Sequence, residues 1–584
     1  MGLLVAATLG IALSAKVDTE VVIIGGGVAG IATAAALTKL GIGPVVVLEA
    51  ADRLGGRLEA VRLSPGAQLA NVGAMWCHHA EGNPVARLAA RHGCRTVPTS
   101  NADAQFFDAS GARLPDALAA PTLARLRAVV AAFLRARDAR GGADPRAPDM
   151  AAALRAHDRR ADPRYAGGTA GAAPYSADER AYLELHAYRN IVEDLTSDLA
   201  DLSADDYDRA EFGGFGRDVL VLDDFFGCVF APLLEGGEGG HPVRADVRLG
   251  TAATAVRRVW TPWGPRVHVT TDAGTTVRAR RAVLAVPLAV LKEALGEPAH
   301  PAATVSEAEA AAFWRVERPR NPLRSLPRLD ARTRRAIARI GVGRALRVAL
   351  AFPGPPFWGA PVESLVLAGA RGADQWAGRG VGSGQHLEFS VVPGDVSVLV
   401  AEADGAYATA LTRLDDDALA DALWRRLARV YGEDTVPRPS KIYARKFLAD
   451  PLTAGSFSFS SVASDREADL AALGLGNGAV FLAGEHASAL KGTVGGAMLS
   501  GWAAAGAVAC SLGATRPYRH VDAELMRELW QPECVARFSG EAEPFDLCVG
   551  EEEGSSSAAF WKLYHDCRID DPDEEGEYEW EPIK

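Results

Sequence analysis

Three glycines and one glutamate near the amino terminus have the types and spacing to hold a dinucleotide. Gly25, Gly27 and Gly30 follow a G-x-G-x-x-G pattern. The first glycine permits a tight turn, the second leaves no Cβ between backbone and pyrophosphate, and the third lets a helix pack closely on a strand. Glu49 lies about twenty residues further on, where a carboxylate accepts hydrogen bonds from a ribose. This pattern predicts redox chemistry with a bound dinucleotide.

The secondary structure around these residues can be predicted from the sequence. Residues 21–24 are a β-branched run that predicts a buried parallel strand, and residues 28–40 predict the following helix. A second strand is expected at 45–48, with Glu49 at its end. The first helix would direct free N–H groups and its positive dipole end at the phosphates. A lone glycine pattern is weak evidence in a chain with 60 glycines among 584 residues, but strand, helix, strand and acid in this order argue against an ordinary βαβ turn.

The glycines alone leave NAD and FAD open. Residues 49–57 read Glu-Ala-Ala-Asp-Arg-Leu-Gly-Gly-Arg. They resemble the Glu-Ala-x-x-x-x-Gly-Gly-Arg stretch of FAD-containing oxidases, in which a second glycine pair and an arginine reach the ribose and phosphates. The resemblance implies FAD, held here by Ala29, Glu49, Ala50, Gly56 and Arg57 in addition to the three glycines.

A second motif near the other end of the chain makes the resemblance more specific. Residues 480–486, Val-Phe-Leu-Ala-Gly-Glu-His, and the glycine-rich residues 492–501 are similar to the FAD-closing motif of the flavin-containing amine oxidases. This family includes polyamine oxidases, monoamine oxidases and lysine-specific histone demethylases. The resemblance implies that Glu485 reaches the ribityl chain. It also implies a helix that begins near Thr493 and Val494 and stabilises negative charge on the reduced ring.

Further segments resemble the same family in the same order along the chain. Residues 73–78 resemble the segment beside the flavin, and the resemblance assigns cofactor contacts to Gly73, Ala74, Met75 and Trp76 and an active-site position to His78. Residues 249–253 resemble the stretch that lies against adenine, with Ala253 where the family commonly has valine. Residues 282–291 and 352–358 are equally typical.

Several residues depart from the family pattern, and these bear on mechanism. Where the family has a lysine that holds a water against flavin N5, this chain has Arg347, which keeps the charge but cannot lose a proton. Phe447 stands where the family usually has tryptophan, and Phe457 where it often has tyrosine. Asp223-Asp224 stands where the family usually has two glycines. The departures imply an altered substrate, slowed oxygen chemistry or a catalytically quiet protein.

The leading hypothesis is an FAD-dependent amine oxidase. A polyamine-like amine would give hydride to flavin N5, and O2 would accept the electrons, yielding imine or aldehyde and hydrogen peroxide. His78 would orient the amine, Phe447 and Phe457 would form an apolar wall, and Arg347 would bind the water or an anionic substrate group. The last possibility keeps L-amino-acid oxidation open. Because Ser456 stands where the cysteine-tethered family members have cysteine, FAD is expected to be noncovalent.

Two other classes of function remain open. One is an FAD-dependent desaturase or isomerase of an apolar substrate, because related folds do both. The other is a catalytically quiet FAD-binding scaffold. A histone-demethylase role is disfavoured, because no long heptad-rich stretch is present.

The resemblance and the element pattern predict an α/β fold, with a Rossmann-like FAD-binding domain interrupted by a mixed α+β substrate-binding domain. Helices are expected at 118–140 and 178–197, and strands at 243–249, 256–260, 266–271 and 282–286. The expected parts are a leader (1–17), FAD-binding parts (18–95, 241–300 and 445–515), a helical insertion (96–240), a second substrate part (301–444) and an acidic extension (516–584).

Charge points to a small cationic partner. The net charge of −12 argues against nucleic-acid binding and favours cationic substrates. Glu193 and Asp194 could attract polyammonium substrates, although acids on a helical insertion are commonly just solvated. The acidic residues 551–581 predict a solvated tail with a potential docking role for a protein partner.

The amino terminus and the cysteines bear on location. Residues 3–15 are apolar and resemble a weak signal peptide, too short for a membrane span, which favours secretion or an endomembrane lumen over the cytoplasm. The seven cysteines lack metal-binding spacing, so no metal is expected. Cys228 lies in an apolar run and is expected to pack in the core. Cys534, Cys548 and Cys567 could form a disulfide in a secreted protein.

Overall fold

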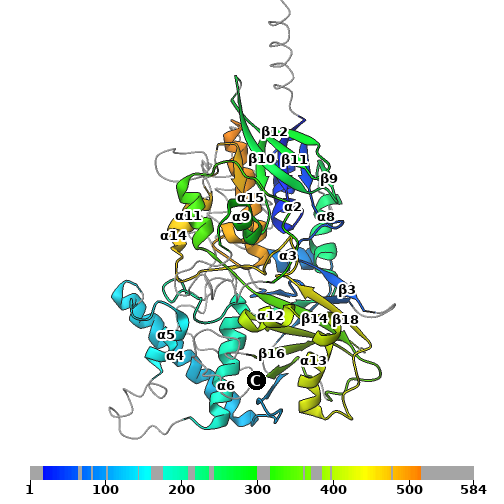
Figure 1. Ribbon diagram of the computed structural model, residues 1–584, viewed down its shortest axis with the longest axis vertical. Coiled ribbons are helices and arrows are strands. Elements are labelled where there is room, and N and C mark those ends of the chain that lie inside the picture. Colours follow the sequence, from blue (N-terminus) through cyan, green and yellow to red (C-terminus); the bar gives the residue numbers. More distant parts are fainter. Residues whose placement is uncertain are drawn as a thin grey trace, which may run out of the picture.

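A computed structural model describes residues 18–513, apart from 64–68, 81–82, 100–102, 143, 159–174, 208–216, 236–241, 263, 299–315, 360–361, 370–384, 395–396, 475 and 477. The expected leader (1–17), the expected acidic extension (516–584) and its three cysteines lie outside the described residues. Within them the chain forms two sheet-based halves, with the nucleotide sheet in the upper part of Figure 1 and a second sheet with a helical layer in the lower part.

The upper sheet has the strand order β10-β11-β12-β1-β2-β9, with β20 beside β12. Its strands are β1 (Thr19–Ile24), β2 (Val45–Leu48), β9 (Ala245–Arg248), β10 (Ala253–Thr261), β11 (Gly264–Thr271), β12 (Thr276–Leu284) and β20 (Val480–Leu482). The pairs β12-β1, β1-β2, β2-β9 and β12-β20 are parallel. Strands from three distant parts of the sequence therefore complete one α/β sheet, and the expected strands are confirmed.

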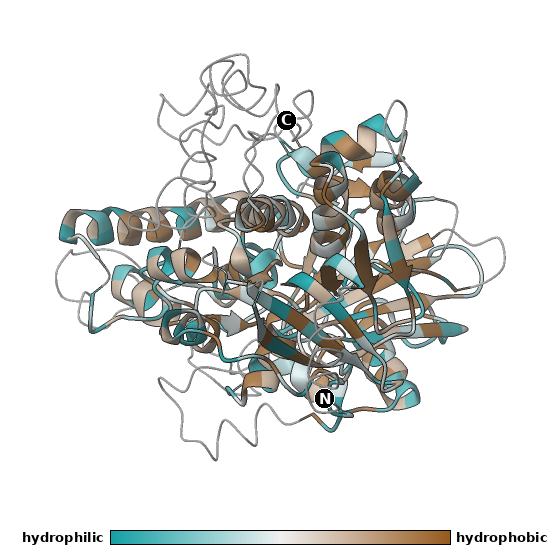
Figure 2. Cartoon of the chain, turned by 90° about the horizontal axis from the view of Figure 1, so that it is seen from above, coloured by the Kyte–Doolittle hydropathy of each residue, from teal (hydrophilic) through white to brown (hydrophobic). Residues whose placement is uncertain are grey.

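Two apolar helices pack on this sheet and on each other. They are α2 (Val28–Lys39) and α15 (Val494–Ser511). A Cβ on Gly501 of α15 would lie 2.4 Å from the Ala29 carbonyl oxygen, and Thr33 Oγ1 donates to the Gly501 carbonyl at 3.1 Å. The missing side chain thus lets the two helix backbones touch. Residues of both helices belong to one buried apolar cluster. Figure 2, coloured by hydropathy, shows that many of the packed helices and strands are largely brown, that is, hydrophobic.

The second sheet has the order β18-β14-β17-β16-β15-β7. Its strands are β7 (Ala104–Phe107), β14 (Ala345–Ala351), β15 (Ser364–Leu367), β16 (Leu387–Val391), β17 (Val398–Asp404) and β18 (Lys441–Lys446). One face packs in an apolar cluster with α12 (Gly405–Thr412) and α13 (Asp416–Tyr431). The other face meets α6 (Ala177–Ala187), whose Tyr182 and Leu185 pack against Phe106 and Val366.

The helical layer consists of α4 (Ala119–Arg140), α5 (Met150–His157) and α6. The helix expected at 118–140 is confirmed. The one expected at 178–197 begins at a Ser176–Glu179 capping box, passes through a π-helical turn, η4 (Tyr188–Val192), and ends in α7 (Glu193–Leu195). Single π-turns are frequent at functional sites, and this one leads directly into two acids.

Shorter elements connect these layers. They are β3 (Ala60–Arg62), β4 (Leu69–Asn71), β5 (Trp76–Cys77), α3 (Pro84–Arg91), β6 (Thr96–Pro98), η2 (Asp116–Leu118), β8 (Val219–Val221), η6 (Phe226–Phe230), α8 (Ala231–Glu235), α9 (Leu288–Leu295), α11 (Ala331–Arg339), β13 (Gly341–Val342), β19 (Ser458–Phe459), α14 (Arg466–Gly474) and η7 (Glu485–Ala487).

Among the described residues, two helical stretches are long and apolar enough to cross a membrane by length and composition alone. They are Asp116–Arg140 and Val494–Ser511. The second is α15, which packs against α2 in the interior of the nucleotide half.

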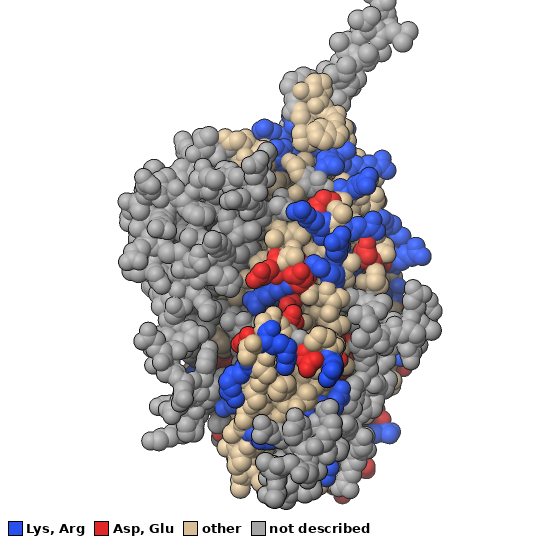
Figure 3. Space-filling view, turned by 90° about the vertical axis from the view of Figure 1, so that its left-hand side faces the viewer, with Lys and Arg blue, Asp and Glu red and all other residues tan. Residues whose placement is uncertain are grey.

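The net charge is unevenly distributed. On the face in Figure 3, lysine and arginine side chains are interspersed with acidic ones, with no continuous acidic patch among the coloured residues. Residues 514–584 contain 19 acidic and 7 basic residues, which accounts for the whole net charge of −12. Residues 1–513 therefore carry no net charge.

Cys228 does more than pack in the core, so the expectation for it is corrected. It forms a disulfide with Cys94, with the two Cα atoms 5.8 Å apart and 134 residues between them in sequence. The bond ties the end of α3 to η6 beside an apolar cluster. Nothing in the spacing of the cysteines indicates this pair. Of the described cysteines, Cys77 is the free one and is buried.

We expect the double substitution C94S/C228S to lower the free energy of unfolding by about 2–5 kcal/mol, because the disulfide closes a long loop in the unfolded chain. Guanidinium unfolding of the two proteins measures the difference. A reducing agent should destabilise the parent protein more than the double variant, in which it can still reduce the disulfide of Cys510. Equal midpoints for the parent and the variant would show that the bond has no stabilising role.

Candidate functional site

A cavity of about 280 Å³ lies between the nucleotide half and the second sheet. Its lining brings together residues expected from sequence to bind cofactor or substrate: Gly25, Gly27, Ala29, Glu49, Ala50, Gly56, Arg57, Gly73, Ala74, Met75, Trp76, His78, Ala253, Arg347, Phe447, Phe457, Glu485, Thr493 and Val494. Gly30 is absent from the lining. A Cβ there would lie 2.0 Å from the Gly25 carbonyl oxygen, so Gly30 packs the helix onto the turn.

The first turn of α2 is built to accept a group against its backbone. Gly25 has φ +108°, and a Cβ there would lie 2.5 Å from the Ala285 carbonyl oxygen. Gly27 is the N-cap and supplies no capping side chain. A Cβ on Gly27 would meet no protein atom within 4 Å, although Gly27 lines the cavity. The space is thus open to a ligand, and the uncapped N–H groups suit a phosphate.

Glu49 is held in one orientation at the end of β2. Its Oε2 accepts from the Gly26 N–H at 2.6 Å, and its Oε1 accepts from the Ala51 N–H at 2.7 Å. Each carboxylate oxygen can accept a further hydrogen bond. Glu49 can therefore still accept from ribose hydroxyls in the cavity.

A buried ion pair at the cavity wall joins distant parts of the sequence. Arg57 Nη1 donates to Glu485 Oε1 at 2.9 Å and to the Ser456 carbonyl at 2.5 Å. Ser458 Oγ and the Gly492 N–H donate to Glu485 Oε2 at 2.5 and 2.9 Å. Burial alone would raise the pKa of Glu485, but Arg57 and the other donors outweigh it and lower the pKa to about 2.

The second helix N-terminus lies where the resemblance implies it. Thr493 caps α15 by accepting from the Gly496 N–H at 2.8 Å, and Thr493 and Val494 both line the cavity. The predicted start of this helix is confirmed. Its positive dipole end can stabilise negative charge on a bound ring.

His78 is held at the cavity wall by an acid that sequence reasoning missed. Its Nδ1 lies 2.9 Å from Asp218 Oδ2, and the His79 N–H donates to Asp218 Oδ1 at 2.7 Å. Burial lowers the pKa of His78, but the Asp218 carboxylate more than offsets this and raises it overall. No motif marks Asp218, which is 140 residues from His78 and next to β8.

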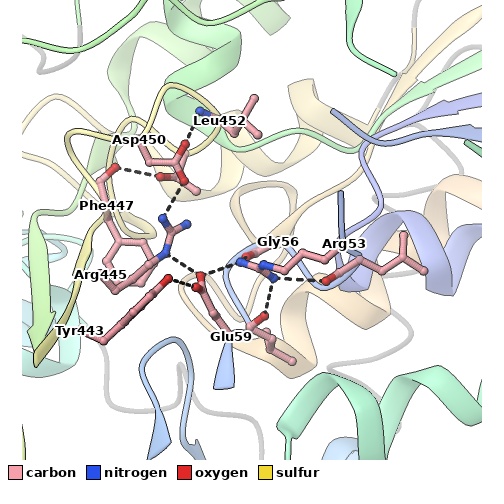
Figure 4. Close-up of polar contacts among 11 residues, drawn as sticks. Arg53, Gly56, Glu59, Tyr443, Arg445, Phe447, Asp450 and Leu452 are labelled. Carbon is pink, nitrogen blue, oxygen red and sulfur yellow. Dashed lines mark hydrogen bonds and ion pairs between the residues drawn. The ribbon is translucent and has the colours of Figure 1, made fainter. Parts of the chain in front are cut away.

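Figure 4 shows how Phe447 is held at the end of β18. The Arg445 guanidinium lies 4.8 Å from the centre of the Phe447 ring, within cation–π range. Arg445 binds Asp450 at 2.7 Å and Glu59 at 3.1 Å, and Arg53 binds Glu59 at 2.6 Å. Glu59 thereby ties the glycine-rich loop of the nucleotide half to the aromatic wall, a role that the sequence does not indicate.

Phe457 and the adjacent Ser456 complete the wall. A Cβ on Gly492 would lie 2.8 Å from the Phe457 ring, so that glycine makes room for the aromatic side chain. The hydroxyls of Ser456 and Thr196 hydrogen-bond at 2.7 Å in the interior. In contrast, Asp223 does not line the cavity, because it binds Arg95 at 2.7 Å on the protein surface.

Arg347 points into the cavity and not to the surface. It forms an ion pair with Glu402, its direct neighbour across the β14-β17 pair. Its guanidinium carbon lies 5.9 Å from the centre of the Trp76 ring. Burial lowers the pKa of Arg347, but the nearby Glu402 and other carboxylates raise it overall, so the side chain stays charged.

Glu193 and Asp194 line the same cavity, which corrects the view that acids on this insertion are simply solvated. The π-helical turn places them there, opposite the sheet that carries Arg347. Glu402 and Asp404 lie directly behind in β17 and are fully buried. No sequence motif marks these two residues, because the rest of β17 has the pattern of an ordinary buried strand.

Comparisons with known proteins agree on one group. A sequence profile described as "Flavin containing amine oxidoreductase" matches residues 28–509. Human lysine-specific histone demethylase 2 is 26% identical, covering 83% of this chain and 52% of the demethylase. Polyamine oxidase 4 of Oryza sativa subsp. japonica is 25% identical, covering 83% of this chain and 88% of the oxidase.

A human peroxisomal N(1)-acetyl-spermine/spermidine oxidase is 26% identical, covering 83% of this chain and 93% of its own. The chain spans about half the length of the human demethylase and about a third of the related mouse lysine-specific histone demethylase 1B. The solved structure of cyclohexylamine oxidase from Brevibacterium oxydans IH-35A matches this chain with a TM-score of 0.58 and 16% sequence identity. The match covers 85% of this chain and 100% of the oxidase chain. At this identity it supports the fold alone.

Proposed function

Because this chain belongs to the flavin-containing amine oxidoreductase family and its cofactor is FAD, we propose that it oxidises a polyamine-like amine with O2 as electron acceptor. The products are an imine, which hydrolyses to an aldehyde, and hydrogen peroxide. FAD, held by the residues around Gly27, Glu49 and Glu485, would supply the redox chemistry, which is hydride transfer from the carbon next to nitrogen and electron transfer to O2.

The observation that carries this proposal is the pairing of acids with an aromatic wall in one cavity. Trp76, Phe447 and Phe457 provide apolar surface that excludes water from the reacting carbon. Glu193 and Asp194 supply negative charge to the same space, which attracts ammonium groups. An apolar substrate of a desaturase or isomerase would make no use of this negative charge.

The surroundings of Arg347 argue against a carboxylate-bearing substrate such as an amino acid. Arg347 Nη1 is buried and makes no hydrogen bond to the described residues, so one donor is open. However, Glu402 already neutralises the guanidinium, and Glu193 and Asp404 lie close enough to influence its pKa. A substrate carboxylate would enter a region with excess negative charge, whereas an ammonium group or a water would not.

Anaerobic stopped-flow absorbance of the purified flavoprotein tests the proposal. We expect di- and polyamines to bleach the flavin, monoamines to do so more slowly and amino acids not to do so. Bleaching by amino acids in preference to polyamines would reverse the substrate assignment. If dithionite reduces the flavin but no amine does, amine oxidation is ruled out. The desaturase or isomerase, or the catalytically quiet scaffold, would then be the better hypothesis.

A further inference from the structure

A threonine with a left-handed backbone conformation follows the two acids that line the cavity. Glu193 and Asp194 belong to α7, and Thr196 caps the end of that helix with φ +47° and ψ +35°. Glycine is the usual residue in this conformation at a helix end, and a β-branched side chain is disfavoured there. Among the described residues, three other than glycine have positive φ, and Thr196 is the β-branched one. Its side chain should therefore supply something that glycine cannot.

The hydroxyl of Thr196 is bonded to the aromatic wall of the cavity. Thr196 Oγ1 and Ser456 Oγ lie 2.7 Å apart, both residues are buried, and Ser456 directly precedes Phe457. A Cβ on Gly343 would lie 1.8 Å from Thr196 Oγ1 and 2.7 Å from Ser456 Oγ. The glycine between β13 and β14 thus makes room for the two hydroxyls. Three segments that are distant in sequence meet at this hydrogen bond.

The chain around Thr196 is also anchored to the start of β14. The Arg344 N–H donates to the Thr196 carbonyl at 2.7 Å. The Arg344 side chain, 1% exposed, binds Asp198 at 2.7 Å and Asp201 at 2.9 Å. The segment that follows α7 is therefore held by β14 on one side and by Ser456 on the other.

The aromatic wall is joined in turn to the FAD site. The Ser456 carbonyl accepts from Arg57 at 2.5 Å, and Arg57 binds Glu485 at 2.9 Å. Leu195, Ser456 and Phe457 all line the cavity. A continuous set of contacts thus sets the distance between the acids of α7 and the part of the cavity that holds FAD.

We propose that Thr196 is a positioning residue that, through its bond to Ser456, makes the site select amines with a second positive charge. The inference rests on the proposed function and adds the substrate class, an amine with a second ammonium group at a set distance. That ammonium lies at Glu193 and Asp194 while the nitrogen next to the oxidised carbon lies beside Phe457. Both contacts can be made at once only when their spacing is correct, because a misplacement of about 1 Å can cost roughly 100-fold in rate. A monoamine occupies one position and does not depend on the spacing.

The test compares anaerobic flavin reduction by diamines, from diaminobutane to diaminododecane, with reduction by monoamines of the same chain lengths. T196V keeps the shape of the side chain and removes the hydroxyl, and S456A removes the other half of the bond. Each should lower the diamine-to-monoamine ratio of rates at limiting amine concentration by roughly tenfold, and the double variant should lower it no further. T196S keeps the hydroxyl and should keep the ratio. An unchanged ratio in T196V and S456A, or an equal loss of rate with both kinds of amine, would overturn the proposal.

A matched control and a readout without turnover separate this proposal from the proposed function. T412V removes another buried hydroxyl, which donates to the Ala408 carbonyl at 2.7 Å within α12, outside the cavity, and should match the parent. Flavin absorbance can follow the binding of octane that carries a guanidinium group at both ends or at one end only, because guanidinium groups keep their charge. The parent should prefer the dication, and T196V and S456A should lose roughly tenfold of that preference.

The two measurements fail in different ways. If no amine reduces the parent flavin, the proposed function fails, and the binding preference still decides the role of Thr196. If the preference for the dication is the same in the parent, T196V and S456A, Thr196 does not position the acids, whether or not an amine reacts.

Discussion

Gly27→Val is expected to abolish FAD binding while leaving the protein folded. A Cβ at this position would meet no protein atom within 4 Å, and Gly27 lines the cavity at the uncapped start of α2. Valine is also compatible with the extended backbone there, at φ −76° and ψ −177°. The new methyl groups would occupy the space next to the N–H groups that bind phosphate. We expect FAD affinity to fall by at least roughly 100-fold, about 3 kcal/mol.

The flavin-to-protein absorbance ratio and fluorescence titration of the apoprotein with FAD measure this effect. Gly27→Ala is the graded control and should lose less affinity, because its single methyl group fills less of the space. The apoproteins of the parent, Gly27→Ala and Gly27→Val should unfold at nearly the same denaturant concentration, because a Cβ at this position meets no protein atom. Normal flavin content in Gly27→Val would show that the phosphates bind elsewhere.

Arg57→Met is expected to be the most destabilising single change in the cradle. It leaves the Glu485 carboxylate, 4% exposed, without its cationic partner. Removing one partner of a buried ion pair costs roughly 3–5 kcal/mol, because the remaining charge is uncompensated. Urea unfolding of the apoproteins at pH 7 gives the value. Adding Glu485→Gln to Arg57→Met should recover part of the loss, and no recovery would mean that the charge of Glu485 is not the cause.

The same ion pair predicts an acid-dependent loss of stability. The pKa of Glu485 is about 2 in the folded protein and 4.5 in the absence of neighbours, so the folded state favours the ionised form. The resulting stabilisation, about 3 kcal/mol, is fully present above pH 4.5 and is lost as the pH falls toward 2. Glu485→Gln should lack this component, so its unfolding free energy should change less between pH 5 and pH 3 than that of the parent.

The FAD site could be predicted from the sequence because the residues that define it act locally. The turn glycines, Glu49 and the start of α15 each act through backbone within a few residues, so residue type and spacing define their geometry. The strands around them could be predicted for the same reason. The π-helical turn could not be predicted, because the sequence of residues 188–192 carries no distinct signal and the turn depends on packing against the second sheet.

Residue types and their spacing are therefore sufficient to predict the cofactor site and the family resemblance. The charges around the cavity could not be predicted in this way, because they come together through long-range contacts. Glu402 reaches Arg347 through strand pairing, Asp218 reaches His78 across 140 residues, and Cys94 bonds Cys228 across 134. Such contacts depend on the strand register and on how elements far apart in the chain cross. A buried carboxylate owes its pKa to the groups that the fold packs around it, and not to its neighbours in sequence.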